Sequence, residues 1–212
     1  IARLHANGQV DESFQCRLGC AIWTGRTMPA GIAAQPDGTV WVCGSFTSIN
    51  GVICSNVARL NPDGSLDPSF RLEEVLPGTN QWVDHLAVQA DGKLLLGGYW
   101  TGPSRSLVRL LANGTLDSSF TSPSVSEFGL TGHINGLATQ SDGRIAIAGS
   151  FYYVNGAPRR HVARLNSNGT LDASFDPGLG PEDGSARAVV IEPSGKIVVA
   201  GSFTRVSGSG RQ

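Results

Sequence analysis

Short apolar runs alternate with glycine-containing turns along the whole chain. Residues 141–151 are typical: an Asp-Gly turn leads into the apolar run 145–148, which ends in Gly-Ser-Phe. The pattern occurs four times, with turn glycines at Gly38, Gly92, Gly143 and Gly195. These glycines are 54, 51 and 52 positions apart. A period of that size indicates a stacked or radial array of repeats.

A second motif recurs between the copies of the first. It consists of Arg-Leu, an Asn-Gly or Asp-Gly turn, and then Asp and Phe, and it is carried by residues 1–14, 58–70, 108–120 and 163–175. Asn-Gly and Asp-Gly between two short runs are the strongest local hairpin signal, because these turns need residues that accept a positive φ. Each repeat is therefore expected to hold two hairpins, that is, four strands.

The strands around the first turn are almost wholly apolar, for example residues 145–147. Little alternation indicates burial on both faces, as in the middle of stacked sheets. No segment shows a helical period with caps. The expected fold is all-β, a β-propeller of four four-stranded blades that forms one domain over residues 1–212. A β-solenoid is the main competitor, but its coils are usually shorter and lack paired hairpins.

The two ends of the chain complement each other within this pattern. Residues 203–212 joined to residues 1–4 recreate an ordinary repeat. The N-terminal hairpin, residues 1–14, could thus complete the last blade and close a ring, which would hide exposed strand edges. The sequence is equally compatible with a segment cut from a longer propeller or array.

The paired motifs resemble the delta-60 repeat family of bacterial β-propeller-like proteins. The sequence ATQSDGRIAIAGSF followed by ARLNSNGTLDASF carries the resemblance, which covers essentially the whole chain in four cyclically permuted copies. The resemblance implies a secreted or cell-surface bacterial protein with no enzymatic activity established for the repeat. The second copy departs from the pattern, because Gly98-Tyr99-Trp100 replaces Gly-Ser-Phe and the next connection is shortened.

The composition of the chain argues against several classes of partner and against a membrane span. The formal net charge is −1 and no block of like charges occurs, which argues against nucleic acid or an anionic membrane surface as a partner. No apolar run approaches the roughly 18 residues needed to span a bilayer. The first residue is Ile1 rather than Met, so we expect a mature or excised segment.

The recurring charges are interpreted as scaffold. Arg and Asp lie nearly opposite each other when each second-motif hairpin folds, which predicts a cross-strand ion pair in every repeat. The pairs are Arg3/Asp11, Arg59/Asp67, Arg109/Asp117 and Arg164/Asp172. The Asp-Gly turns lack the spacing of a calcium loop, and no cysteine or histidine spacing supports zinc. No catalytic triad, phosphate loop or HExxH helix is recognisable, so no catalytic residue, metal or cofactor is expected.

The four cysteines lie in the first third of the chain. Cys43 occupies the small-residue slot that other repeats fill with Gly or Ala, so it is expected to be a buried core thiol. Cys16, Cys20 and Cys54 fall in connections that should share one face. A disulfide between Cys54 and either Cys16 or Cys20 is therefore predicted for an oxidising compartment.

One face varies between repeats and is the candidate binding surface. Strand alternation places the connections between repeats, and those between the second and third strands, opposite the tight turns. Variable loops on a rigid scaffold commonly carry binding residues, and exposed aromatic rings beside Arg and Asp suit a sugar or protein partner. The candidates are Trp23, Arg26, Trp82, Asp84, His85, Phe128, Tyr152, Tyr153, Arg159, Arg160, Glu182, Asp183 and Arg187.

The leading functional hypothesis is a non-enzymatic extracellular or cell-surface module that binds a protein or glycan through this face. An alternative is a structural subunit whose chain ends pair through strands into a homo-oligomer or filament. The third and least favoured is a carbohydrate-active enzyme with an acid pair drawn from Asp84, Glu182 and Asp183.

Overall fold

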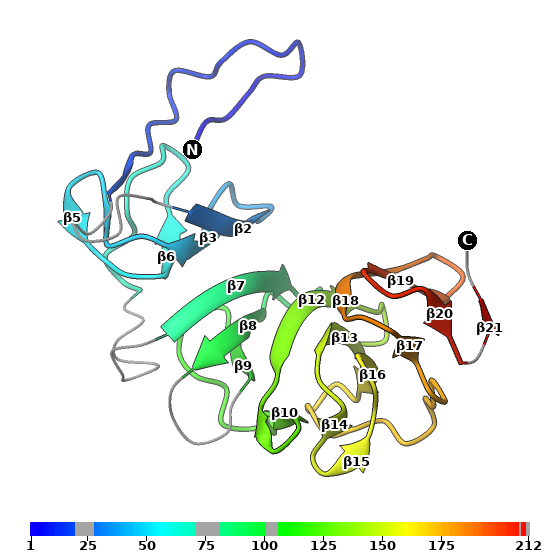
Figure 1. Ribbon diagram of the computed structural model, residues 1–212. Coiled ribbons are helices and arrows are strands. Elements are labelled where there is room, and N and C mark those ends of the chain that lie inside the picture. Colours follow the sequence, from blue (N-terminus) through cyan, green and yellow to red (C-terminus); the bar gives the residue numbers. More distant parts are fainter. Residues whose placement is uncertain (20–27, 71–80, 101–105, 208, 211–212) are drawn as a thin grey trace. The chain divides into compact units, whose positions relative to one another are not determined.

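The computed structural model describes residues 1–212 except residues 20–27, 71–80, 101–105, 208 and 211–212 (Figure 1). The described part contains strands, turns and bends, and no helix. The prediction of an all-β fold is therefore confirmed. The chain divides into two compact units, Ile1–Leu86 and Ala87–Gln212.

The first unit contains two small sheets. The sheet of order β2-β3-β6 comes from the first repeat motif, and the sheet of order β1-β4-β5 comes from its connections. The strands are β1 (Leu18–Gly19), β2 (Met28–Ala34), β3 (Val40–Ser45), β4 (Ser48–Ile49), β5 (Val52–Ile53) and β6 (Val57–Leu60), followed by β7 (Gln81–Val88), which runs into the second unit.

The second unit repeats this organisation. The main sheets have the orders β7-β8-β9, β12-β13-β16 and β18-β19, and the sheets built from connections have the orders β11-β10-β14-β15 and β17-β20-β21. The strands are β8 (Leu94–Trp100), β9 (Leu107–Leu110), β10 (Val125–Glu127), β11 (Leu130–Thr131), β12 (His133–Thr139), β13 (Ile145–Ser150), β14 (Tyr153–Val154), β15 (Ala157–Pro158), β16 (Val162–Leu165), β17 (Pro181–Glu182), β18 (Ala186–Ile191), β19 (Ile197–Gly201), β20 (Arg205–Val206) and β21 (Ser209–Gly210).

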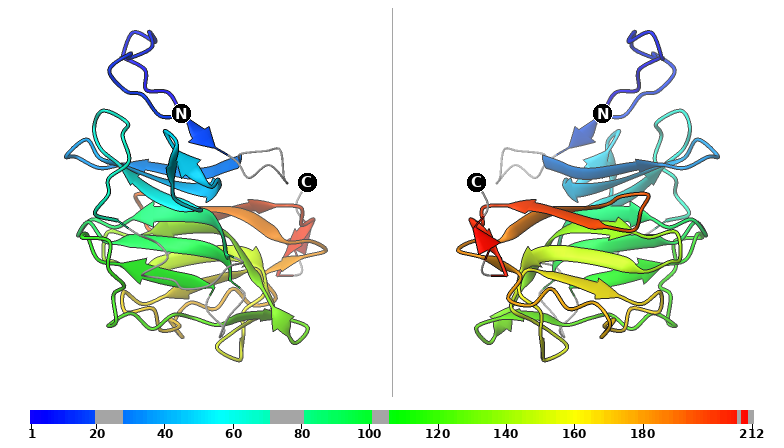
Figure 2. Two further views of the ribbon diagram at one scale, coloured as in Figure 1. Left: turned by 90° about the vertical axis from the view of Figure 1, so that its left-hand side faces the viewer. Right: turned by 90° about the vertical axis from the view of Figure 1, so that its right-hand side faces the viewer.

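The main sheets of the second unit pack face to face, so that β12 contacts both β8 and β18 (Figure 2). The apolar run of β13 is buried from Ile145 to Gly149, which confirms the prediction of burial on both faces for this strand. Small residues allow the sheets to approach: a Cβ added to Gly97 would lie 3.1 Å from the Leu137 side chain. The outer sheet differs, because Val190 and Val198 remain 58% and 45% exposed.

The prediction of four strands in every repeat is wrong. Among the described residues, each main sheet has at most three strands, and the expected fourth is reduced to one bridge in every copy: Leu4↔Val10, Leu60↔Leu66, Leu110↔Leu116 and Leu165↔Leu171. The Asp that follows ends the strand. In the fourth copy, Asp172 Oδ1 accepts hydrogen bonds from the backbone N–H and the hydroxyl group of Ser174, and this local turn competes with further pairing.

Candidate functional site

The Arg and Asp of the second motif form the ion pair that the sequence predicts. Arg109 Nε lies 2.9 Å from Asp117 Oδ2, and both side chains are 6% exposed. The guanidinium also lies over the Phe120 ring at 4.6 Å from its centroid. Hydrogen bonds from Ser119, and then from Arg109, lower the pKa of Asp117 to about 2. The pairs Arg3/Asp11, Arg59/Asp67 and Arg164/Asp172 have the same geometry.

The same motif also joins successive repeats within each unit. Arg3 Nη1 donates to the carbonyl oxygen of Pro62 at 2.7 Å, and Arg109 Nη1 donates to that of Ser167. Thr121 N donates to the carbonyl oxygen of Asn168 at 2.8 Å. The recurring charges therefore have a structural role in holding one repeat to the next.

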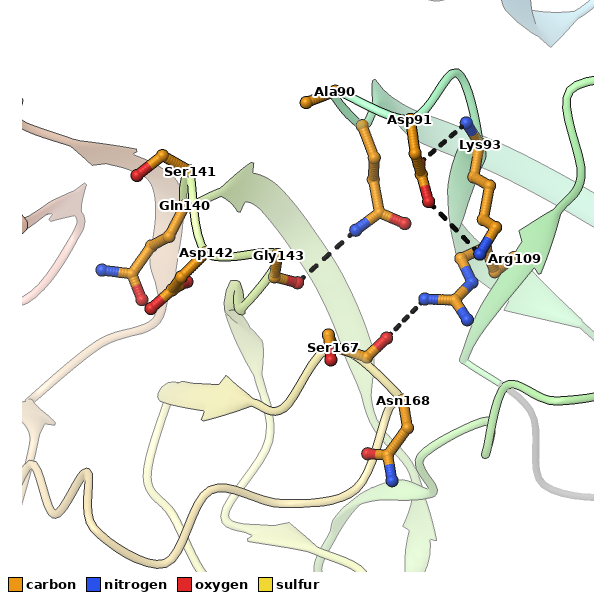
Figure 3. A pocket seen from close by; sticks show the side chains of 11 residues that line it. Ala90, Asp91, Lys93, Arg109, Gln140, Ser141, Asp142, Gly143, Ser167 and Asn168 are labelled. Atoms are coloured by element: carbon orange, nitrogen blue, oxygen red, sulfur yellow. Dashed lines mark hydrogen bonds and ion pairs between the residues drawn. The ribbon is translucent and has the colours of Figure 1, made fainter.

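A polar cleft of about 420 Å³ lies between the tight turns of two successive repeats (Figure 3). Lys93 Nζ pairs with Asp91 at 3.2 Å, and the Arg109 guanidinium pairs with Asp117. Gln89 Nε2 donates to the carbonyl oxygen of Gly143 at 3.5 Å. The charges that line this cleft are satisfied within the protein, so we assign the cleft to the scaffold.

The connections opposite the tight turns are built into sheets of their own. The segment that precedes a repeat pairs with the hairpin between the second and third strands of that repeat, as β1 with β4, β10 with β14 and β17 with β20. These pairings place the two kinds of connection together, as the strand alternation in the sequence predicts. The strands themselves were missed, because each pairs only two or three residues and gives no measurable alternation.

An aromatic cleft opens on the connection sheet of β10, β11, β14 and β15. Its volume is about 290 Å³, and it is lined by Phe128, Tyr152, Tyr153, Pro158, Arg160, Gly178 and Leu179. The Phe128 and Tyr152 rings meet edge to face, with centroids 4.7 Å apart. The Arg160 guanidinium lies 5.0 Å from the centroid of the Tyr152 ring. The structure thus brings together four of the predicted candidates.

Phe128 occupies an unfavourable backbone conformation. It precedes Gly129 in the tight turn between β10 and β11, and the two residues have φ values of 48° and 80°. Other connection hairpins have Asn50, Asn155 and Ser207 in their turns, at φ 50°, 51° and 49°. Asn tolerates this left-handed region, whereas a bulky aromatic residue there is an outlier. Phe128 is nevertheless 79% exposed, so burial of its ring does not account for the choice.

The imidazole ring of His161 packs against Tyr152, one of the residues that line the cleft. It is buried, its Nδ1–H donates to the carbonyl oxygen of Gly149 at 3.0 Å, and its ring centroid lies 5.1 Å from that of Tyr152. Burial lowers the pKa of His161, so the imidazole is neutral at pH 7.

The remaining candidates do not line this cleft. Arg159 donates to the carbonyl oxygen of Pro158 at 2.7 Å, and Asp183 accepts a hydrogen bond from Thr204 at 3.1 Å. Arg187 is exposed on β18, and Glu182 lies on β17. Asp84 and His85 belong to β7 in the first unit, where burial lowers the pKa of His85. Trp23, Arg26 and the side chain of Trp82 lie outside the described residues.

The cysteine predictions have different outcomes. Cys43 is fully buried, and burial raises the pKa of its thiol to about 12, which confirms a core thiol. Cys16 is a free, buried thiol, so the predicted Cys16–Cys54 disulfide is not formed. Cys20 lies outside the described residues, and its pairing with Cys54 stays a prediction. Among the described residues, no group of His, Cys, Asp and Glu side chains is arranged to hold a metal ion.

Comparison with known proteins identifies the repeat. A family described as "Domain of unknown function (DUF5122) beta-propeller" matches residues 35–70, 89–120, 140–175 and 192–212. This family corresponds to the delta-60 repeats under a different name, so the predicted resemblance is confirmed. No curated protein matches the chain. No helix among the described residues is long and apolar enough to cross a membrane.

A solved structure with a similar chain is that of a catalytically inactive virginiamycin B lyase from Staphylococcus aureus with quinupristin. The identity is 16%, the TM-score is 0.48, and the match covers 88% of this chain and 59% of the lyase chain. The lyase is named as an enzyme, so this comparison gives no support to the expectation of a non-enzymatic protein, and that expectation is not carried further. At this level of similarity the match assigns no activity to the present chain.

Proposed function

Because the chain belongs to the DUF5122 β-propeller family, we propose that it is an extracellular or cell-surface interaction module that binds a protein or glycan through its aromatic cleft. In this proposal the repeats form four blades that close into a ring, and the connection sheets present the ligand site on one face. The family supplies a rigid scaffold, and function on such scaffolds is carried by variable loops.

The observation that carries the proposal is Phe128. A left-handed conformation costs a non-glycine residue roughly 1–3 kcal/mol, and such strain clusters at ligand-binding positions. Three other connection hairpins use the small polar residues Asn50, Asn155 and Ser207 in this conformation. Aromatic residues, phenylalanine included, are enriched where proteins contact their partners.

The test compares the chain with its Phe128→Asn variant. Binding to a panel of neutral glycans, acidic glycans and candidate surface proteins is measured by surface plasmon resonance. The variant should keep the fold and lose at least about tenfold in affinity for any ligand that the unsubstituted chain binds. Ala157→Ser, on the same sheet outside the lining of the cleft, is the matched control. Binding that is identical in all three proteins, or absent from the whole panel, would refute the proposal.

A second candidate function is strand-mediated assembly, and the open edge of β19 favours it. β19 pairs only with β18 among the described strands, whereas β3 and β13 each have two partners. Leu4 is 59% exposed, whereas the equivalent Leu60 and Leu165 are fully buried. An unpaired strand and an unpaired edge of matching sequence can pair within or between copies.

Light scattering over a wide concentration range tests this second function. Concentration-dependent oligomers that disappear when residues 1–14 are deleted would support assembly. A monomer at every concentration would rule assembly out and would favour closure of the ring within one chain.

A further inference from the structure

We infer that the ligand of the aromatic cleft is a saccharide unit that carries a carboxylate, as a uronic acid residue does. This inference rests on the proposed function and adds the chemical class of the ligand. Three features of the cleft carry it: its size, its exposed rings and the charge of Arg160.

The cleft has the size of a small ligand. Its volume of about 290 Å³ is just below the range for drug-sized ligands, roughly 300–1,000 Å³. A specific protein interface buries about 800 Å² on each partner, spread over some twenty residues. The cleft alone offers much less surface, so one or two sugar rings fit it better than a folded partner.

The rings present flat apolar surface to solvent. Phe128, Leu179 and Tyr153 are 79%, 59% and 43% exposed, and Tyr152 joins Phe128 through its ring edge. A pyranose ring has one face of C–H groups and a rim of hydroxyl groups. Aromatic side chains with a polar tip, such as tyrosine, match this combination because the ring covers the apolar face and the hydroxyl group bonds to the rim.

Arg160 supplies a positive charge with open donors. It is exposed, and the Tyr152 ring lies beneath its guanidinium. No hydrogen bond or ion pair of its side chain occurs among the described residues, whereas Arg164 is bound by Asp172. Guanidinium groups bind carboxylates through two parallel hydrogen bonds.

Other charges near the cleft do not cancel this one. Among the lining residues, Arg160 alone is charged at neutral pH. His161, behind Tyr152, is neutral because its pKa is lowered. Glu127 precedes Phe128 and acts electrostatically on His161, but it does not line the cleft. A carboxylate in the cleft therefore meets an unpaired cation.

Calorimetric titration of the full 212-residue chain tests the inference. The probes are trigalacturonate and trimannuronate, each compared with the same trisaccharide after reduction of its carboxyl groups to primary alcohols. We expect an acidic trisaccharide to bind at least about tenfold more tightly than its neutral counterpart, which is the usual effect of one charged hydrogen bond. The difference should shrink as salt is raised.

Variants assign the effect to Arg160. Arg160→Gln should remove the preference for the acidic probe, and Arg160→Lys should restore part of it because the charge remains without the bidentate geometry. Lys196→Gln makes the same change in net charge on an exposed residue of a tight turn that does not line the cleft, and it should leave binding unchanged. Thermal unfolding of each variant confirms that it is folded.

The outcomes separate this inference from the proposed function. Equal binding of acidic and neutral probes, with both lost in Phe128→Asn, would overturn the inference and leave the proposed function standing. Binding of a surface protein with no binding of either acidic probe would also overturn the inference and leave the proposed function standing. Acidic-probe binding that is unaffected by both Phe128→Asn and Arg160→Gln would place the ligand elsewhere and overturn both.

Discussion

The guanidinium group of Arg109 pairs with Asp117 in its own hairpin and donates to the carbonyl oxygen of Ser167 in the next repeat. Arg3 makes the equivalent contacts in the first unit, with Asp11 and with the carbonyl oxygen of Pro62. One recurring side chain therefore closes a hairpin and also fastens it to its neighbour. This double use explains why the Arg and the Asp recur together.

Arg109→Leu is expected to lower the free energy of unfolding by about 3–5 kcal/mol, because Asp117 would be left as a buried charge without its partner. Urea denaturation measures the change. Arg3→Leu is the matched control, since the Arg3 side chain is 38% exposed and the loss of an exposed pair costs about 1 kcal/mol or less. Equal losses in the two variants would contradict a special role for burial.

Gly169→Ala tests the contact between repeats separately from backbone strain. Gly169 has φ +88°, and a Cβ there would collide with the Thr121 carbonyl oxygen. Gly156 has φ +79° with nothing within 4 Å of an added Cβ. We expect Gly156→Ala to cost about 1 kcal/mol from φ alone, and Gly169→Ala to cost more than 2 kcal/mol in urea denaturation, within the range for overpacking. Similar costs would show that the collision is relieved by movement of one repeat.

The repeat architecture could be predicted from the sequence because its signals are local. The turn Asp142-Gly143 and the apolar run after it determine the hairpin of β12 and β13, and Arg164 with Asp172 follows from the register of one hairpin. The prediction of a fourth strand is wrong, because Asp172 does more than pair with Arg164. Its second oxygen binds Ser174 and turns the chain away from the sheet.

The sequence predicts which face of the fold carries the candidate site, but not how the residues of that site are arranged. Tyr152, Tyr153 and Arg160 were identified because they are aromatic or charged residues in a variable connection. Their arrangement around Phe128 depends on pairing between β10 and β14, segments almost 30 residues apart that share two paired positions. Such short pairings carry no periodic signal. The one available clue was Phe128-Gly129, an aromatic residue before Gly where other connection turns have Asn50, Asn155 or Ser207.

Acid should destabilise the protein through the recurring aspartates. The pKa values of Asp117 and Asp172 are lowered to about 2 by hydrogen bonds from Ser119 and Ser174 and by their arginines. A carboxyl group whose pKa is lower in the folded state stabilises the protein above its unfolded pKa, about 3.9. This contribution is fully present above about pH 5 and is lost as the pH falls from about 4 to 2. Urea denaturation across this range should show the decline, and Asp172→Asn should make it shallower.

Ser174→Ala provides a finer test of the same carboxyl group. The hydroxyl group of Ser174 is the largest cause of the lowered pKa of Asp172. Its removal should raise that pKa towards the ordinary value, which can be followed by NMR titration of the side-chain carboxyl carbon. An unchanged pKa would show that Arg164 alone is sufficient.

Phe128→Asn is expected to maintain or increase the stability of the fold. Asn tolerates the left-handed conformation better than Phe, and relief of this strain is worth about 1 kcal/mol. Loss of the edge contact with Tyr152 offsets part of the gain, because such ring pairs contribute roughly 0.5–1.5 kcal/mol. Phe128→Ala separates the two effects, since Ala also loses the ring contact but has no preference for positive φ. We expect the Asn variant to be about 1 kcal/mol more stable than the Ala variant in urea denaturation. If Asn and Ala destabilise the fold equally, Phe128 is held by packing, and its conformation is no longer evidence for a binding role.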